Sequence, residues 1–172
     1  LRGQSLQCNE LEKGYFNSGV LLINTLAWAQ ESVSAKAMSM LADKAIVSRL
    51  TYMDQDILNL ILLGKVKFID AKYNTQFSLN YELKKSFVCP INDETVLIHY
   101  VGPTKPWHYW AGYPSAQPFI KAKEASPWKN EPLMRPVNSN YARYCAKHNF
   151  KQNKPINGIM NYIYYFYLKI IK

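Results

Sequence analysis

The chain has 172 residues, of which 48% are hydrophobic and 19% are charged. This composition is that of a globular protein, and it excludes a disordered chain, a collagen-like repeat and a disulfide-rich miniprotein. The 21 Lys and Arg side chains outnumber the 12 Asp and Glu side chains, which gives a formal net charge of +9. The length suits one domain or part of one, and because the first residue is Leu1 we expect further sequence upstream.

The positive charge is concentrated in the last third of the chain. Residues 1–120 contain 11 basic and 10 acidic side chains, whereas residues 121–172 contain 10 basic and 2 acidic side chains. A local basic field of this kind attracts a polyanion, and the candidates are nucleic acid, an anionic membrane face and a phosphorylated glycan. A solvated basic surface without a partner is the alternative interpretation.

The three cysteines, Cys8, Cys89 and Cys145, are odd in number and too far apart for a Cys-x-x-Cys zinc or redox motif. We therefore expect a reducing compartment. No basic segment followed by a short apolar run and a small-residue cleavage site is visible, so this stretch predicts no signal peptide.

Strands and helices are predicted to alternate at the start of the chain, which is typical of an α/β layer. Residues 20–24 are a short apolar run rich in branched side chains, and they predict a buried strand. Thr25 is then predicted to cap a helix that continues to about Lys44. A second helix is predicted over residues 54–63, where it ends before Gly64.

The middle of the chain predicts less regular structure. Short strands are expected over residues 66–69 and 95–99, while residues 71–94 are too irregular to assign. Seven prolines between Pro103 and Pro136 predict a loop-like segment.

The last 17 residues, 156–172, form an apolar and Tyr-rich tail. Two Asn and one Gly interrupt it, and Tyr prefers the membrane interface, so the tail predicts a poor membrane span. Basic residues precede the tail at Arg135, Arg143, Lys147, Lys151 and Lys154. We expect a helix that lies on an anionic leaflet, and the alternative is a helix packed on the core of its own domain.

A candidate metal and phosphate site lies at the end of the predicted strand 95–99. His99 closes an apolar run, Gly102 follows three residues later, and Lys105 follows three residues after that. An imidazole can ligate a divalent ion, a glycine lets the backbone approach phosphate oxygens, and an ammonium offsets negative charge. A structural role for His99 is the alternative.

Asp54, Gln55 and Asp56 look like an Asp-x-Asp metal motif, but they open a predicted helix. Side chains two positions apart on a helix diverge by about 200° and cannot readily share one ion. We therefore predict Asp54 as an N-cap, with Gln55 and Asp56 facing a cleft, and capping alone is the alternative. Asn17 and Gly19 form a polar and small pair that allows a ligand to approach, or that simply caps a turn.

Three segments, taken in order, resemble the motifs of glycosyltransferase family 8. They are residues 15–24, 54–59 and 99–107. The segment from Ser126 to the Tyr-rich end is similar to the C-terminal extension of the family members that add glucose or galactose to the lipopolysaccharide outer core. The resemblance therefore covers the C-terminal portion of such an enzyme.

This resemblance implies a GT-A fold, a UDP-hexose donor, a Mn²⁺ or Mg²⁺ ion and transfer with retention of anomeric configuration. Residues 1–118 would be the C-terminal half of the catalytic domain, and residues 119–172 would be a basic, mostly helical extension. By position, His99 resembles the metal ligand, and Gly102 and Lys105 resemble contacts to the donor diphosphate.

The remaining site residues follow from the same resemblance. Asn17 and Gly19 resemble residues that line the donor-sugar pocket, whereas Asp54 and Gln55 resemble catalytic residues around the anomeric carbon. Gln55 would lie opposite the leaving UDP and stabilise positive charge on the sugar. Because an amide is a weak nucleophile, we expect the acceptor hydroxyl to attack from the same face as the departing phosphate.

The chain departs from the family pattern before Tyr15. The family's metal-binding Asp-x-Asp should lie there, but residues 1–14 contain no Asp. His99 alone would hold weakly an ion that takes about six donors, so we expect this chain by itself to be inactive or very impaired.

The implied partners are a UDP-hexose, the lipopolysaccharide core acceptor and an anionic membrane surface, which residues 121–172 would contact. The expected location is cytoplasmic, on the inner face of the bacterial cytoplasmic membrane. A non-catalytic module that binds anionic membrane or glycan is the alternative function. Nucleic acid is not expected, because no zinc finger, RNP motif or GxxG clamp accompanies the charge.

Overall fold

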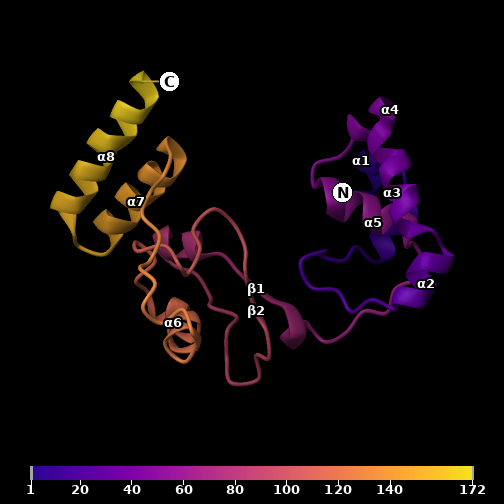
Figure 1. Cartoon of the computed structure of the whole chain (residues 1–172), viewed down its shortest axis with the longest axis horizontal. Helices are drawn as coiled ribbons and strands as arrows, with labels where there is room; N and C mark the ends of the chain where they lie inside the picture. Colours follow the sequence, from indigo (N-terminus) through magenta and orange to yellow (C-terminus); the bar gives the residue numbers. More distant parts are fainter. Residues whose placement is uncertain (1, 172) are drawn as a thin grey trace. The chain divides into compact units, whose positions relative to one another are not determined.

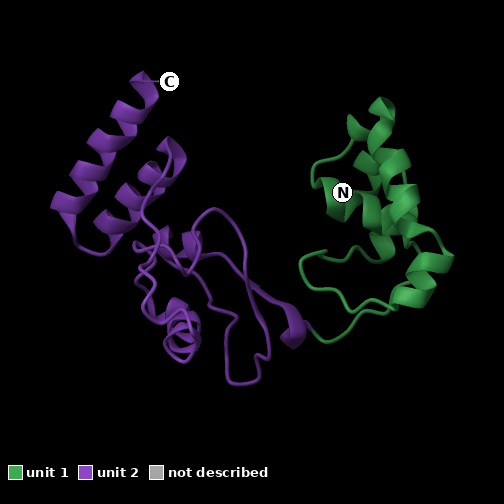
Figure 2. Cartoon of the chain, viewed as in Figure 1, with its two compact units in different colours: residues 1–70 green, residues 71–172 purple. Residues whose placement is uncertain are grey.

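The computed structural model describes residues 2–171, which form two compact units that meet in the sequence between residues 70 and 71 (Figure 2). Among the described residues, the regular elements of the first unit are helices, and the second unit holds two strands as well as helices (Figure 1). Helices combined with a small parallel sheet agree with the predicted α/β class.

The helices of the first unit bury a small apolar set of side chains. They are α1 (Arg2–Leu6), the 3₁₀ turn η1 (Asn9–Lys13), α2 (Thr25–Gln30), α3 (Val33–Ala42), α4 (Lys44–Val47) and α5 (Met53–Ile61). Leu6, Leu11, Val33 and Ile57 are almost completely buried. Burial of Ile57 fixes the rotation of α5 and so decides where the other side chains of that helix point.

The long helix predicted from Thr25 to about Lys44 is present as two shorter helices, α2 and α3, and a third helix, α4, begins at Lys44. Ser32, between α2 and α3, has a left-handed backbone with a φ of 51°. At the start of α4, Asp43 Oδ1 accepts a hydrogen bond from Ala45 N at 2.8 Å. Hydrogen bonds from a short side chain to a nearby backbone group compete with a continuous helix. This competition explains the break between α3 and α4.

Both predicted helix caps are wrong, although the second predicted helix is confirmed as α5. Asn24, not Thr25, accepts the capping hydrogen bond from Ala27 N, at 3.1 Å. Since α5 begins at Met53, Asp54 lies within its first turn rather than at its cap. A carboxylate in that turn still interacts favourably with the positive end of the helix dipole.

The strands predicted over residues 20–24 and 66–69 are wrong, because both segments are irregular. Leu22 is fully exposed, and Phe68 and Ile69 are 57% and 59% exposed. A strand is stabilised by hydrogen bonds and side-chain pairs with a neighbour, and neither described strand pairs with these segments. The apolar composition of these segments therefore predicted strands, but no described strand is present to pair with them.

The second unit contains a two-stranded parallel sheet (Figure 1). Its first elements are η2 (Ala71–Asn74), β1 (Thr75–Phe77), η3 (Leu79–Leu83) and β2 (Ile98–Tyr100). The strand predicted over 95–99 is thus displaced toward the C-terminus, and β1 lies in the segment 71–94, which had no assignment. In the register of the sheet, Gln76 lies opposite His99.

The core of the second unit lies against this sheet. It consists of Phe77, Leu79, Ala111, Tyr113 and Ala116, and the partly buried Ile91 and Tyr100 pack against it. Because β1 and β2 each contribute an aromatic side chain, the core fixes the strand that carries His99.

The proline-rich segment 103–136 is not entirely a loop, which corrects the prediction. It contains η4 (Pro114–Ala116) and the helix α6 (Gln117–Glu124). Pro114 and Pro118 lie in the first turns of these elements. A proline is tolerated there because its missing N–H has no partner within a helix.

The chain ends in a helical hairpin of α7 (Ser139–Lys151) and α8 (Pro155–Ile170), which lie side by side (Figure 1). The predicted C-terminal helix is thus confirmed as α8. Gly158 of α8 is buried, and a Cβ placed there would come within 2.6 Å of the Phe150 ring. The small residue allows close approach of the two helices at this point.

The other side of α8 is exposed and apolar. Its side chains with more than half of their surface exposed are Ile156, Ile159, Met160, Ile163, Phe166, Tyr167 and Ile170. Within residues 2–171, no helix is long and apolar enough to cross a membrane.

Candidate functional site

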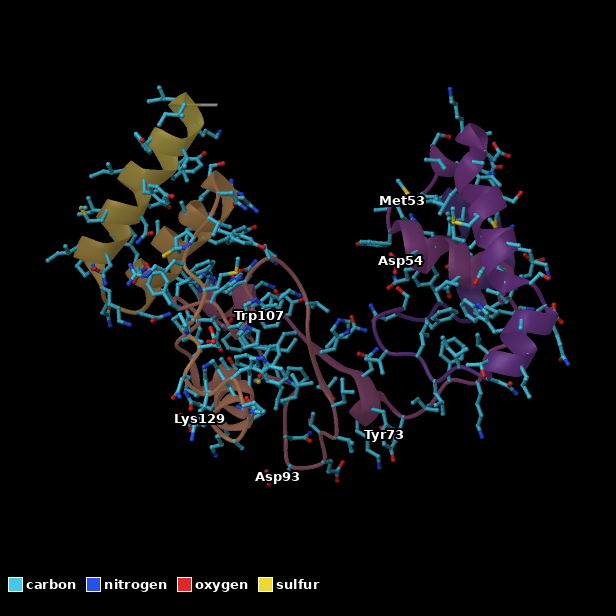
Figure 3. All side chains as sticks on the ribbon, viewed as in Figure 1. Met53, Asp54, Tyr73, Asp93, Trp107 and Lys129 are labelled. Carbon is cyan, nitrogen blue, oxygen red and sulfur yellow. The ribbon has the colours of Figure 1, made fainter. Side chains whose placement is uncertain are left out.

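In the first unit, the loop at Asn17 meets the first turn of α5. Gln55 Oε1 accepts hydrogen bonds from Asn17 Nδ2 at 2.9 Å and from Ser18 N at 3.2 Å. Ser18 Oγ donates to Asp54 Oδ2 at 2.7 Å, and Figure 3 labels Asp54 on this turn. Gly19 N donates to Asn17 Oδ1 at 3.0 Å and closes a tight turn. The structure therefore brings together all four residues predicted in this half of the chain.

Asp56 supports this loop from within the unit, which corrects the prediction that it faces a cleft. Its side chain is fully buried and accepts hydrogen bonds from Arg2, from Tyr15 OH and from the backbone N–H of Thr51 and Tyr52. Burial acts to raise the pKa of Asp56, but these hydrogen bonds outweigh burial and hold the pKa below its usual value. Asp56 is thus a buried carboxylate that ties α1, the Tyr15 segment and α5 together.

Asn59, one turn further along α5, clamps the backbone just before Asn17. Its Oδ1 accepts from Phe16 N at 2.9 Å, and its Nδ2 donates to Phe16 O at 2.8 Å. The sequence did not single out Asn59 for this role. The available signal is the pair of polar residues, Asp56 and Asn59, three positions apart beside the apolar Ile57, where burial demands hydrogen-bond partners.

In the second unit, His99 has the hydrogen bonding of a metal-binding imidazole. Its Nδ1 donates to Asn74 Oδ1 at 3.0 Å, so the lone pair lies on Nε2. Among the described residues, the side-chain hydrogen bond of His99 is made by Nδ1. Burial, and next the positive charge of Lys105, lower the pKa of His99, which keeps the ring neutral at neutral pH.

The loop after β2 carries Gly102 and Lys105. Gly102 has a φ of +82°, and a Cβ at this position would lie 2.8 Å from Ser78 Oγ. Lys105 Nζ donates to Tyr100 O at 2.6 Å, which leaves two of its three N–H donors for a ligand. Burial lowers the pKa of Lys105. This loop, with His99 on the preceding strand, forms the second predicted cluster.

A buried histidine of α7 holds the same loop, and the sequence did not predict it. His148 is fully buried, its Nε2 lies 3.0 Å from Thr104 Oγ1 and 3.1 Å from Asn80 Oδ1, and its Nδ1 lies 2.7 Å from Tyr113 OH. Burial, followed by the charges of His108 and Lys147, lowers the pKa of His148 to about 4. A neutral imidazole therefore links the C-terminal hairpin to the Gly102 loop.

The donor set for a metal ion is small. Among residues 2–171, no group of three or more His, Cys, Asp and Glu side chains gathers in a way that could hold an ion. His99 fits the role of a single ligand, because Asn74 orients its ring and the Nε2 lone pair is available.

Two family profiles match consecutive parts of this chain. "Glycosyl transferase family 8" matches residues 2–111, and "Glycosyl transferase family 8 C-terminal" matches residues 113–169. The chain belongs to glycosyltransferase family 8. The resemblance seen in the three ordered segments and in the tail is thereby confirmed, and enzymes of this family generally depend on a divalent cation.

The curated relatives of this chain include lipopolysaccharide glucosyltransferases and a lipopolysaccharide galactosyltransferase. The chain is 54% identical over 170 residues to the lipopolysaccharide glucosyltransferase WaaO of Escherichia coli K12, covering 98% of this chain and 50% of the relative. The chain is 50% identical to the lipopolysaccharide 1,3-galactosyltransferase of Salmonella typhimurium, and the match covers 99% of this chain and 51% of the relative. It is 40% identical to an Escherichia coli lipopolysaccharide 1,2-glucosyltransferase, and that match covers 94% of this chain and 49% of the relative. The chain therefore spans about half the length of these relatives. No solved structure matches it.

Proposed function

We propose that this chain is part of a retaining hexosyltransferase, which moves glucose or galactose from a UDP-sugar to the lipopolysaccharide core. The observation that carries the proposal is the identity of 54% and 50% to a lipopolysaccharide glucosyltransferase and galactosyltransferase over almost the whole chain. In this proposal the chain forms part of a GT-A fold, with residues 1–118 in the catalytic domain and residues 119–172 as the extension.

The second unit supplies the groups that receive the leaving diphosphate. His99 Nε2 would ligate Mn²⁺ or Mg²⁺, and the bound ion would neutralise negative charge on the diphosphate oxygens. Lys105 directs its two remaining N–H donors to phosphate oxygens while its third stays on Tyr100 O. Gly102 gives the backbone its left-handed turn without a side chain over the loop.

The first unit supplies the groups near the donor sugar. Asn17 and Gly19 line the sugar pocket, and two hydrogen bonds, from Asn17 Nδ2 to Gln55 Oε1 and from Gly19 N to Asn17 Oδ1, hold Asn17 in a fixed position. Gln55 Oε1 presents a partial negative charge to the positive charge that develops at the anomeric carbon, and Asp54 adds a full one. Because both are held by the Ser18 segment, they stabilise charge without first having to reorganise.

We also propose that residues 121–172 rest on an anionic membrane surface on the cytoplasmic side. The exposed apolar side chains of α8 and the excess of basic residues in this segment support this placement. The relatives are a lipopolysaccharide glucosyltransferase and a lipopolysaccharide galactosyltransferase, which fits an acceptor that carries a lipid. The expectation that the 172-residue chain alone turns over little UDP-hexose stays a prediction.

The residue roles are tested in a chimera that joins the part of the Escherichia coli relative that this chain does not cover to residues 1–172. His99→Ala and Lys105→Ala should each lower kcat/KM for UDP-hexose by about 100-fold, because each group acts on the leaving-group charge. Lys85→Ala, which removes an exposed charge outside both clusters and outside residues 121–172, is the matched control and should leave kcat/KM unchanged. Unchanged transfer in the His99 and Lys105 variants would remove their assigned roles.

A further inference from the structure

A groove in the second unit lies outside the two clusters predicted to bind the sugar donor. It has a volume of about 440 Å³ and lies between residues 132–135 and the first half of α8. Its lining includes Tyr109, Leu133, Arg135, Asn157, Met160 and Asn161. We refer to it as the Arg135 groove.

Hydrogen bonds hold the walls of the Arg135 groove in place. Met134 N donates to Trp107 O at 2.8 Å, and Tyr109 N donates to Met134 O at 3.1 Å, so the 132–135 segment is fixed beside Tyr109. From the other wall, Asn161 Nδ2 donates to Tyr109 OH at 3.2 Å. Tyr109 thus joins both walls, and the groove exists before any ligand arrives.

The side chains of the groove match the chemistry of an anionic sugar. Tyr109 offers an aromatic ring for the apolar face of a sugar. Asn161 Nδ2 donates to Tyr109 OH and to Asn157 O, which leaves Asn161 Oδ1, together with the Asn157 amide, for the hydroxyl groups of a sugar. Arg135 is exposed and forms no ion pair with a described residue. A guanidinium free to bind in this way pairs with phosphate through two parallel hydrogen bonds.

The groove is also coupled to the predicted diphosphate loop. His108, next to Tyr109, donates its backbone N–H to Lys105 O at 3.0 Å, and its Nδ1 accepts from Lys105 N at 3.1 Å. These two hydrogen bonds hold the backbone between Lys105 and Tyr109 in a turn. A ligand in the groove lies on a segment that directly continues the loop.

We propose that the Arg135 groove binds a phosphorylated sugar of the acceptor oligosaccharide, away from the sugar that receives the hexose. Arg135 holds the phosphate, while Tyr109 and the two Asn side chains hold the sugar ring. The excess of basic over acidic residues in 121–172 favours such an anionic ligand. This inference rests on the proposed function, because it takes the lipopolysaccharide core as the acceptor.

The test measures binding of the lipid-free, phosphorylated core oligosaccharide to the purified 172-residue chain by calorimetry, without any UDP-sugar. Arg135→Ala should weaken binding by about tenfold or more, since a hydrogen-bonded charge pair is lost. The matched control Lys129→Ala removes the same charge from the same basic segment and should change the Kd less than about twofold. Circular dichroism verifies that both variants fold.

A second arm separates the sugar from its phosphate. Dephosphorylated oligosaccharide should bind the unsubstituted chain about as weakly as the phosphorylated one binds Arg135→Ala, and inorganic phosphate alone should compete poorly. Equal losses in Arg135→Ala and Lys129→Ala, or no binding by the unsubstituted chain, would overturn the inference. Hexose transfer by the chimera is measured separately, so binding without transfer contradicts only the proposed function, and transfer without Arg135-dependent binding contradicts only the groove.

Discussion

Gly102 is a residue at which the backbone conformation and a near neighbour both exclude a side chain. Its φ of +82° is strained for any residue with a Cβ, and Ser78 Oγ occupies the space that the Cβ would take. Gly64 has a similar φ of +73°, but no atom lies within 4 Å of its Cβ position. The two glycines therefore separate backbone strain from crowding.

We predict that Gly64→Ala lowers the free energy of unfolding by about 1 kcal/mol, from backbone strain alone. Gly102→Ala should cost about twice as much or more, because Ser78 must also move. Adding Ser78→Ala to Gly102→Ala should bring the loss back to the Gly64→Ala value, as measured by urea unfolding. Equal losses for the two single glycine variants would show that Ser78 does not crowd Gly102.

Several site residues could be predicted individually from the sequence, but the buried side chains that hold them in place could not. Asn17, Gly19, Asp54 and Gln55 were selected by resemblance, and the structure joins them through short hydrogen bonds. The buried carboxylate of Asp56 was misplaced at a cleft, because its partner Arg2 lies 54 positions away in the sequence. The spacing of neighbouring residues in the sequence does not reveal a hydrogen-bond partner that lies so far away in the chain.

At the scale of elements, helices were easier to predict than strands. The helical spacing that predicted α5 is local, since it needs only side chains three and four positions apart. The run at residues 20–24 has strand composition, but no described strand pairs with it, and Leu22 is fully exposed. Strand formation depends on a neighbouring chain segment, which composition cannot supply.

The link between α7 and the Gly102 loop makes a prediction about pH. An unfolded histidine has a pKa near 6.5, while burial lowers the pKa of His148 to about 4. His148 is thus neutral in both states above about pH 6.5, and below that the unfolded state takes up a proton first. The stability associated with His148 is complete above about pH 6.5 and is lost as the pH falls toward about 4.

Measuring Tm against pH tests this prediction. Between pH 6.5 and 4 the unsubstituted chain should lose Tm, and His148→Gln should lose it less steeply, since one proton-linked group is gone. His108 is buried with a pKa also lowered to about 4, so His108→Gln should reduce the slope similarly. An unchanged slope in His148→Gln would mean that its imidazole is not held neutral by the fold.

For the whole molecule, the structure shows which elements carry most of the net charge of +9. Most of it belongs to residues 121–172, which include the α7 and α8 hairpin, the exposed apolar side of α8 and all the lining of the Arg135 groove except Tyr109. The segment therefore offers an anionic ligand both a basic field and a defined groove. The sequence predicted the field, but the groove depends on the pairing of Met134 with Tyr109, which only the folded chain reveals.

The central claim is that this family 8 chain, together with the part of the relatives that it does not cover, transfers a hexose with retention. The most direct measurement incubates the chimera with UDP-glucose or UDP-galactose, Mn²⁺ and lipopolysaccharide lacking its outer core, and determines the anomeric configuration of the product by NMR. We expect one α-linked hexose to be added, and we expect His99→Ala to lower kcat/KM for transfer by about 100-fold. A folded chimera that binds UDP-hexose but transfers none, or that forms a β-linked product, would contradict it.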